Sequence, residues 1–343
     1  MNRRDALRLM ASTAGGLVTG VSLPTFAAGT PIDLHTDTNT PLYAGWLDDT
    51  KSRARFVKAN RYPFLNQLSS NIKGTGKGKK VLLWKLFEQI TGRPLVPHYQ
   101  TVGDCVSHAF GLGIDVLTAV RILMQNKSEK WVAKSATEII YAGSRVEVGK
   151  GVLTKDGSRA EWAAEFIRQW GVLLRQSYLS GEHDFTIYDG HKARALGQSD
   201  GRGVPDELEP LCKLHPVKTC ARVQSWEDCR DSVANGYPVI MCSNIGFNTK
   251  RDRDGFLRRG RRPWYHGMVI IGIDDEYRRS GGLVQNSWGG DVWVSGPKRH
   301  GQPDGSFWCD AATIDAAMKQ GDSIAISGYV GYPRQDIPNY IIW

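Results

Sequence analysis

Residues 99–124, with the sequence YQTVGDCVSHAFGLGIDVLTAVRILM, constrain the fold more than any other stretch of this chain. From Cys105 onward, apolar residues recur at steps of three and four without an intervening proline, so the pattern predicts a buried helix. Gly103 suits a turn and Asp104 suits an N-cap, which places Cys105 in the first helical turn. Backbone N–H groups and the positive end of the helix dipole lower the pKa of a thiol at such a place. We therefore predict that Cys105 is a nucleophile.

Two later stretches add groups that suit thiol chemistry. Residues 265–274, YHGMVIIGID, place His266 at the start of an apolar strand pattern, and residues 284–290, VQNSWGG, place Asn286 after another. Together with the Cys105 segment, and in this order, they resemble the three motifs of the papain-like cysteine proteases. The resemblance covers residues 95–329. It implies an α+β fold with two lobes, one helical and one antiparallel and β-barrel-like, and an active-site cleft between them.

The resemblance also implies a catalytic role for each of these residues. Cys105 would attack a carbonyl carbon, His266 would act as general acid and base, and Asn286 would orient the imidazole ring. Gln100 and the backbone N–H of Cys105 would form the oxyanion hole. Gln100 departs from the family pattern, because it stands one residue nearer to the nucleophile than the family's glutamine does.

Three further residues are candidates for substrate binding. Gly157 and Ser158 lie before the third predicted helix, where the family has a loop that lines the cleft. An ordinary N-cap turn is the alternative interpretation of these two residues. Trp288 matches the tryptophan that shields the family's histidine–asparagine contact from water. His108 follows Cys105 by one helical turn, and a residue on the same helix cannot readily face the thiol across a cleft. We therefore interpret it as a packing residue or as one that supports the site without direct contact with the substrate.

The patterns on either side of the three motifs agree with two lobes. Helix patterns cover residues 81–90, 105–124, 129–145 and 158–170, and one more lies at 226–235. Runs rich in β-branched residues, bounded by turn residues, predict strands at 217–223, 239–243, 267–274, 282–287 and 323–330.

Residues 1–28 are predicted to be a signal peptide of the twin-arginine type. Arg3 and Arg4 open a stretch that resembles this export motif, a mildly apolar stretch follows at residues 11–21, and Thr25 and Ala27 suit cleavage. A disordered tail is the alternative. The apolar stretch is too short and too rich in glycine for a permanent membrane span. We therefore expect export, to the periplasm or outside the cell, through the twin-arginine machinery.

Residues 29–94 are predicted to be an N-terminal extension or linker with one short helix, and residues 95–343 the peptidase domain. The stretch from residue 29 to residue 80 is polar and irregular, and it ends in a flexible basic run. One hypothesis is that it crosses the cleft and inhibits the enzyme, with residues 74–80 as an exposed cleavage site.

Composition excludes several classes of function. The formal charge of +9 comes from basic residues that are interspersed with acidic ones, so we expect no nucleic-acid partner. The arginines of residues 251–262 are interpreted as a solvated loop face, with binding of acidic substrate groups as the alternative. His183, His191 and His215 lack the spacing of metal ligands, and we expect neither a metal nor a cofactor. Besides Cys105 there are five cysteines, which allow at most two disulfides of unknown connectivity.

The sequence therefore predicts an exported cysteine-type peptidase that cleaves peptide or protein substrates through a thioester intermediate. Two alternatives remain open. An acyl transferase would use the same thioester but pass the acyl group to an amine in place of water. A catalytically silent binding module would retain the fold without turnover.

Overall fold

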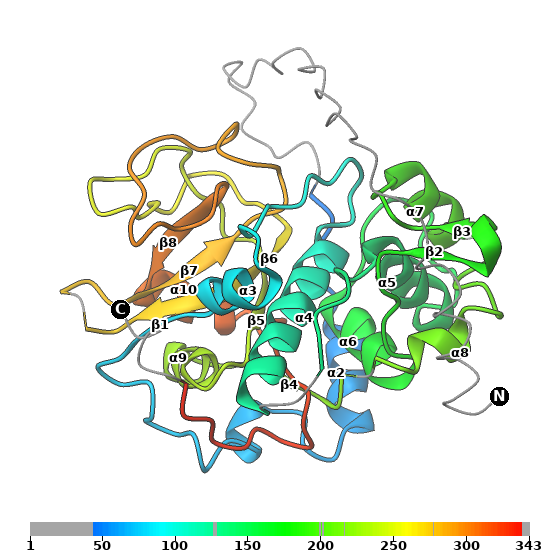
Figure 1. The fold of residues 1–343 in the computed structure, drawn as a ribbon. Coiled ribbons are helices and arrows are strands. Elements are labelled where there is room, and N and C mark those ends of the chain that lie inside the picture. The colour runs from blue at the N-terminus through cyan, green and yellow to red at the C-terminus, as the bar shows by residue number, and fades with distance from the viewer. Residues whose placement is uncertain are drawn as a thin grey trace. The chain divides into compact units, whose positions relative to one another are not determined.

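The structure is a computed structural model that describes residues 44–125, 129–198, 200, 202–215, 217–276 and 278–337. The predicted signal peptide and residues 29–43 of the predicted extension lie outside the described residues. The described part combines helices with an antiparallel sheet, which is the α+β class that the sequence predicts. Figure 1 shows α4 (Cys105–Met124) between the sheet and the helices α5 (Thr137–Gly143) and α6 (Ala160–Gln169).

The remaining helical elements are α2 (Thr50–Ala59), η1 (Leu65–Gln67), α3 (Leu83–Thr91), η2 (Ser144–Val148), η3 (Leu179–Gly181), α7 (Gly190–Gly197), α8 (Glu209–Cys212), α9 (Trp226–Ala234) and α10 (Ala311–Met318). The strands are β1 (Lys80–Leu82), β2 (Ser177–Tyr178), β3 (His183–Asp184), β4 (Thr219–Arg222), β5 (Val239–Ser243), β6 (His266–Asp274), β7 (Gly281–Gln285), β8 (Ser306–Asp310) and β9 (Ile324–Ser327).

Helix α4 is the central element of the core, as the sequence predicts. It begins at Cys105, packs on β6 and α3, and is buried over most of its length. Its length and composition would also suit a membrane span, but 83% of its most apolar window is buried inside the protein, which is typical of a core helix. Gly267 permits the close approach of β6, because a Cβ atom there would lie 3.1 Å from the Cα of Val106.

The main sheet brings the histidine and asparagine segments to one edge. Its strands follow the order β4-β9-β5-β6-β7-β8, and β1 pairs with β6; all of these pairs are antiparallel. Within the described ranges β4 and β8 do not pair, so the sheet is open and is barrel-like only in a loose sense. His266 begins β6, and Asn286 directly follows the last residue of the neighbouring β7. Because the two strands run in opposite directions, these residues lie side by side.

Residues 44–80, which the sequence suggested as an irregular linker, are packed onto the domain where they are described. Helix α2 lies against α6, and Asp231 accepts hydrogen bonds from the backbone N–H groups of Gly74 and Gly76. Four buried apolar side chains anchor the segment in the core: Trp46, Phe56, Leu65 and Ile72. The polar average composition of the segment conceals these isolated residues, although four large buried side chains are enough to fix a segment of this length.

Other expectations differ from the structure at element boundaries. The predicted helix at 129–145 forms only from Thr137, because Ser135 and Ala136 pair with residues 173–174 in an extended conformation. The predicted helix at 81–90 begins as strand β1. Helices α7 and α10 and strand β8 were not predicted. All six cysteines lie in the described ranges, and each is buried with a free thiol.

Candidate active site

Cys105 lies in the first turn of α4, but its surroundings differ from the simple helix-start site that the sequence predicts. Asp104 occupies the N-cap position, yet its side chain makes no capping hydrogen bond. Its carboxylate instead accepts a hydrogen bond from the Tyr188 hydroxyl at 2.9 Å and lies 3.3 Å from Nε2 of His108. The Cys105 Sγ accepts a hydrogen bond from the backbone N–H of Gly267 at 3.3 Å. The residue after His266 therefore touches the thiol directly.

His266 and Asn286 form a buried pair at the edge of the sheet. Nε2 of His266 lies 2.8 Å from Oδ1 of Asn286, which also accepts the backbone N–H of Ser287 at 2.7 Å. The Trp288 ring packs on the imidazole, with 4.6 Å between ring centroids. Nδ1 of His266 is buried and has no hydrogen-bond partner among the described groups. One imidazole nitrogen is thus oriented by an amide, while the other is available for proton transfer.

Burial keeps both reactive groups neutral in this state. It raises the pKa of the Cys105 thiol to about 12, and the negative charge of Asp104 adds to the effect, although backbone N–H groups oppose it. Burial also lowers the pKa of His266 to about 4, against the opposing hydrogen bond to Asn286. The expected lowering of the thiol pKa by the helix start is therefore outweighed here. Both shifts favour a thiol and a neutral imidazole near neutral pH.

Gln100 connects the turn before Cys105 to the asparagine loop. Its backbone N–H donates to the carbonyl of Ser287 at 2.9 Å, and its side-chain oxygen accepts from the Ser287 hydroxyl. Its Nε2 donates to the carbonyl of Val102 at 2.9 Å. The structure thus gives Gln100 a role in holding two loops together, which the sequence did not suggest.

The strap, which we define as residues 44–47, lies along the predicted substrate-binding residues. The backbone N–H of Ser158 donates to the carbonyl of Gly45 at 2.8 Å, and that of Leu47 donates to the carbonyl of Ser158 at 2.9 Å. Gly157 has a φ of 117°, and a Cβ atom there would lie 2.9 Å from Cγ of Leu47. Ser158 therefore contacts an extended peptide backbone, and this peptide belongs to the chain itself.

The strap also reaches the opposite side of the site and comes close to the thiol. The N–H groups of Gly45 and Trp46 both donate to the carbonyl of Tyr265, each at 3.1 Å. The Gly45 N–H lies close enough to the sulfur of Cys105 to lower the pKa of the thiol, against the larger effect of burial. No side chain fits at this point, because a Cβ atom on Gly45 would lie 2.0 Å from the carbonyl oxygen of Gly103. The strap is thus hydrogen-bonded through its backbone to both sides of the site and lies close to the nucleophile.

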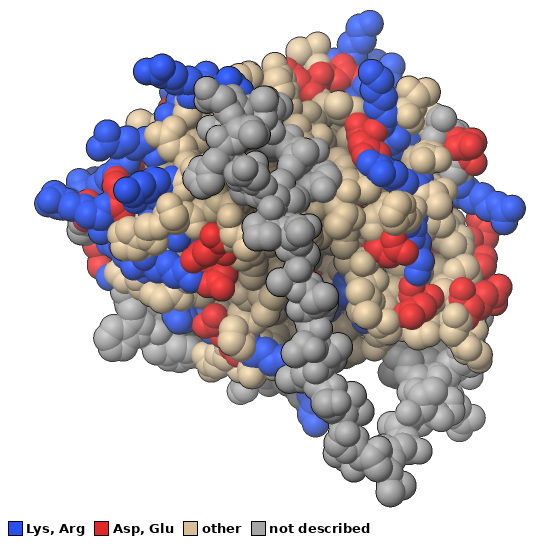
Figure 2. Space-filling model, turned by 90° about the horizontal axis from the view of Figure 1, so that it is seen from above, with Lys and Arg blue, Asp and Glu red and all other residues tan. Residues whose placement is uncertain are grey.

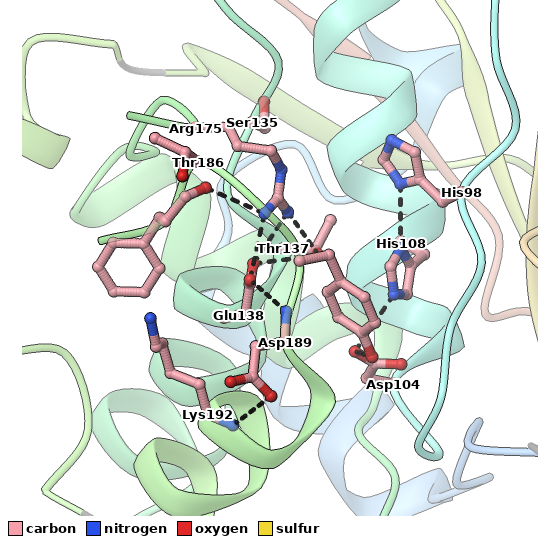
Figure 3. Close-up of polar contacts among 12 residues, drawn as sticks. His98, Asp104, His108, Ser135, Thr137, Glu138, Arg175, Thr186, Asp189 and Lys192 are labelled. Atoms are coloured by element: carbon pink, nitrogen blue, oxygen red, sulfur yellow. Dashed lines mark hydrogen bonds and ion pairs between the residues drawn. The ribbon is translucent and has the colours of Figure 1, made fainter. Parts of the chain in front are cut away.

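His108 belongs to a separate polar network under the start of α4. Figure 3 shows it between His98 and Asp104, and its Nδ1 lies 3.0 Å from Nδ1 of His98. This agrees with the interpretation of His108 as a packing residue, since its ring nitrogens face these two groups and not the thiol. The pKa of His98 lies well below its ordinary value because the ring is buried, and His108 and nearby cations add to the effect.

The remaining candidates lie apart from this site. Arg251, in the predicted basic loop, is buried and donates to the carbonyl of Ser306 and to Asp291, so it serves the fold. On the face shown in Figure 2, basic and acidic side chains are interspersed. In the described part of the chain, one group has the spacing of metal ligands, and it lies at the surface: Glu182, His183 and Glu207.

No protein-family model matches the sequence, and comparison with the curated proteins gives no match. Solved structures with a similar fold include xylellain, a cysteine protease from Xylella fastidiosa, with a TM-score of 0.49, 16% identity, and coverage of 83% of this chain and 91% of that one. The bromelain protease from Ananas comosus has a TM-score of 0.44 and 15% identity, with coverage of 73% of this chain and 98% of that one. ProCathepsin B S9 from Trypanosoma congolense has a TM-score of 0.47 and 11% identity, with coverage of 86% of this chain and 87% of that one. At these identities the likeness concerns the overall fold alone.

Proposed function

We propose that this protein is a cysteine-type peptidase that cleaves peptide bonds through Cys105, His266 and Asn286. One observation carries the proposal: the thiol, which contacts the residue next to His266, lies close to an extended peptide backbone that is hydrogen-bonded on both sides of the site. A protein that binds an extended chain across a thiol, with an oriented imidazole beside it, has what acyl transfer from a peptide requires.

In the proposed reaction, Nδ1 of His266 takes the proton of Cys105 as the sulfur attacks the carbonyl carbon of a bound peptide. The S–C bond forms, the C–N bond breaks, and the imidazolium gives its proton to the departing amine. Water then attacks the thioester while His266 accepts a proton from it, and the carboxylic acid and the free thiol result. Asn286 holds the ring in one orientation throughout both steps.

The developing oxyanion requires hydrogen-bond donors near Cys105. The backbone N–H of Cys105 stands at the beginning of α4, where the helix leaves N–H groups unpaired. We assign the second donor to the Nε2 amide of Gln100. Its present hydrogen bond to Val102 fixes the amide within the turn that precedes the nucleophile.

The strap must leave the site before a substrate binds. We propose that the strap holds the enzyme inactive, because Gly45 lies close to the sulfur and burial keeps the thiol neutral. Only residues 44–47 block the site, whereas Phe56, Leu65 and Ile72 are core residues, so opening does not require the whole segment to detach.

We also propose export by the twin-arginine route, which carries folded proteins. All six thiols are buried and free, so folding needs no disulfide and is compatible with completion in a reducing compartment. Replacement of Arg3 and Arg4 by lysine should retain the protein in the cytoplasm with its first 28 residues uncleaved. Normal export of this variant would exclude the route.

Digestion of a peptide library by the full chain carrying Trp46→Ala tests the peptidase function, with Trp46→Ala/Cys105→Ala as the inactive control. New carboxyl termini in the first sample alone support hydrolysis. Products that carry an added amine in place of a free acid identify an acyl transferase. A variant that binds peptides but leaves them intact, while Cys105 remains open to alkylation, is a binding module.

A further inference from the structure

The contacts described so far restrain the side-chain amide of Asn286 at its oxygen. Oδ1 of Asn286 lies 2.8 Å from Nε2 of His266 and accepts the backbone N–H of Ser287 at 2.7 Å. Nδ2 of Asn286 is buried and has no hydrogen-bond partner among the residues that the structure describes. A buried N–H without a partner costs free energy, and such groups in folded proteins usually bind protein or ordered water. We therefore looked for a partner on this side of the amide.

A small cavity lies beside the amide. It has a volume of about 10 Å³, and its wall includes Asn286, the preceding Gln285, and two histidines from the start of the helical region, His98 and His108. Oε1 of Gln285 and Nε2 of His98 are also buried without a partner within the described ranges. A cavity of about 10–15 Å³ holds one water molecule when its wall offers two to four polar partners. The cavity meets both conditions.

The two histidines connect the cavity to a buried carboxylate. Nδ1 of His98 lies 3.0 Å from Nδ1 of His108, and Nε2 of His108 lies 3.3 Å from Oδ2 of Asp104 (Figure 3). Asp104 is 1% exposed, and it also accepts the hydroxyl of Tyr188 at 2.9 Å. The chain of contacts thus begins at a charge and ends at the cavity.

The charge of Asp104 favours one arrangement of protons in the two rings. Between neutral rings, the contact of the two Nδ1 atoms needs one donor and one acceptor. If His108 donated from Nδ1, the bare lone pair of its Nε2 would face the carboxylate. A neutral His108 therefore carries its proton on Nε2, so that His98 donates from Nδ1 and keeps a lone pair on Nε2. Burial lowers the pKa of His98 well below its ordinary value, and nearby cations add to the effect, which agrees with a neutral ring.

We propose that a water molecule in this cavity joins Asn286 to His98, and that His98 and His108 are positioning residues for Asn286. The water accepts a hydrogen bond from Nδ2 of Asn286. It donates one proton to Oε1 of Gln285 and the other to the lone pair on Nε2 of His98. Each of the three polar atoms that lack a partner in the wall of the cavity is then satisfied.

The positioning role rests on the proposed peptidase function. The backbone N–H of Ser287 holds the oxygen end of the amide, and the chain from Asp104 holds its nitrogen end. An amide that is restrained at both ends keeps Oδ1 directed at Nε2 of His266. Nε2 then carries the proton of the neutral ring, and Nδ1 of His266 has the lone pair that takes the proton of Cys105.

Nitrogen NMR of the full chain with isotope-labelled histidine tests the chain of contacts without any turnover. We expect His98 to be neutral with its proton on Nδ1 and His108 to be neutral with its proton on Nε2; the variants His98→Phe and His108→Phe assign the two sets of signals. The opposite tautomers, or a charged His108, would refute the arrangement. A crystal structure that resolves ordered water should show one molecule within hydrogen-bond distance of Asn286, Gln285 and His98, and an empty cavity would refute the proposal.

A double-mutant cycle in the Trp46→Ala chain tests the positioning role. His98→Phe keeps the shape of a ring and removes both nitrogens. We expect it to lower kcat at least about threefold with a smaller effect on KM, and to have no further effect once Asn286→Ala is present. An equal loss in both backgrounds, or no loss in either, would show that His98 does not act through Asn286. His215→Phe is the matched control, because His215 is also partly buried but lies outside the chain of contacts, and it should leave kcat unchanged.

These experiments separate this inference from the peptidase function. If no variant cleaves peptides while the tautomers and the water are as expected, the link to Asn286 is supported and the function is refuted. If the Trp46→Ala chain cleaves peptides and His98→Phe does not change kcat, the function is supported and the positioning role is refuted. Circular dichroism shows whether each variant is folded. The tautomers and the water are observed in the unsubstituted chain, so they decide the proposal even if a variant does not fold.

Discussion

Replacement of Trp46 by alanine should expose Cys105 to alkylation. The indole is almost completely buried, and a tryptophan in such a place removes about 150–250 Å² from water. At about 25 cal/mol per Å² this area contributes about 4–6 kcal/mol, and the hydrogen bond to Asp322 adds about 1 kcal/mol. Partial relaxation of the pocket reduces the measured loss to about 3–5 kcal/mol. Because each 1.4 kcal/mol is a factor of about ten, the population with an open strap should rise between about a hundredfold and several thousandfold.

Brief iodoacetamide treatment near pH 7, followed by mass-spectrometric mapping, measures this change. The buried neutral thiol reacts only when the strap opens, so the rate at Cys105 reports the open population. Trp226→Ala is the control, since that indole is 7% exposed but lies on α9, away from the strap. We expect Trp46→Ala to accelerate the alkylation of Cys105 alone, and Trp226→Ala to have no selective effect on the alkylation of Cys105.

Two results would refute this reasoning. If Trp46→Ala accelerates the alkylation of all six cysteines equally, the variant unfolds as a whole and the strap does not open independently of the domain. If Cys105 reacts as quickly in the unmodified chain as in the variant, the strap is already open in solution, and the proposed inhibition is wrong.

Three other outcomes follow from the site and its supporting helix. His266→Ala should abolish peptide cleavage in the Trp46→Ala chain while Asn286→Ala lowers kcat less, because asparagine only orients a ring that is still present; the reverse order would contradict the assignment. Gln100→Ala should lower kcat about a hundredfold or more if its amide reaches the oxyanion, and near-normal kinetics would move that role to another donor. Burial raises the pKa of Asp115 to about 6, so its contribution to stability is complete below about pH 4 and is lost as the pH rises towards 6. The free energy of unfolding of Asp115→Asn, measured by denaturation and compared with that of the unmodified chain, should therefore rise by up to about 3 kcal/mol between pH 4 and pH 7. A difference between the two chains that stays constant over this range would exclude the effect.

The parts of the fold that follow from local patterns were predictable from the sequence. The 3.6-residue periodicity after Cys105 identifies α4, and β-branched runs identify β5 and β6 almost to the residue. The order of the three motifs predicts that Cys105, His266 and Asn286 share one site, and antiparallel pairing of β6 with β7 explains how the last two meet. Each of these features is encoded within a short stretch of chain.

The covering of the site was not predictable in the same way. The strap has no periodicity, and its partners Ser158 and Tyr265 lie more than a hundred residues further along the chain. The pKa of Cys105 differs from the expectation for a related reason. The helix start is a local feature, whereas the burial of the thiol is a tertiary one, and the effect of burial on the pKa of the thiol is larger.

The most direct test of the central claim is to detect an acyl group on Cys105 during turnover. The Trp46→Ala chain is mixed with a peptide substrate, quenched in acid within one turnover, and its fragments are weighed by mass spectrometry. We expect the fragment that contains Cys105 to carry the mass of the acyl part, to lose it with time as the free acid appears, and to remain unmodified in the Cys105→Ala control. Cleavage that proceeds equally in that control, or an unmodified Cys105 that alkylates readily yet cleaves nothing, would contradict the account.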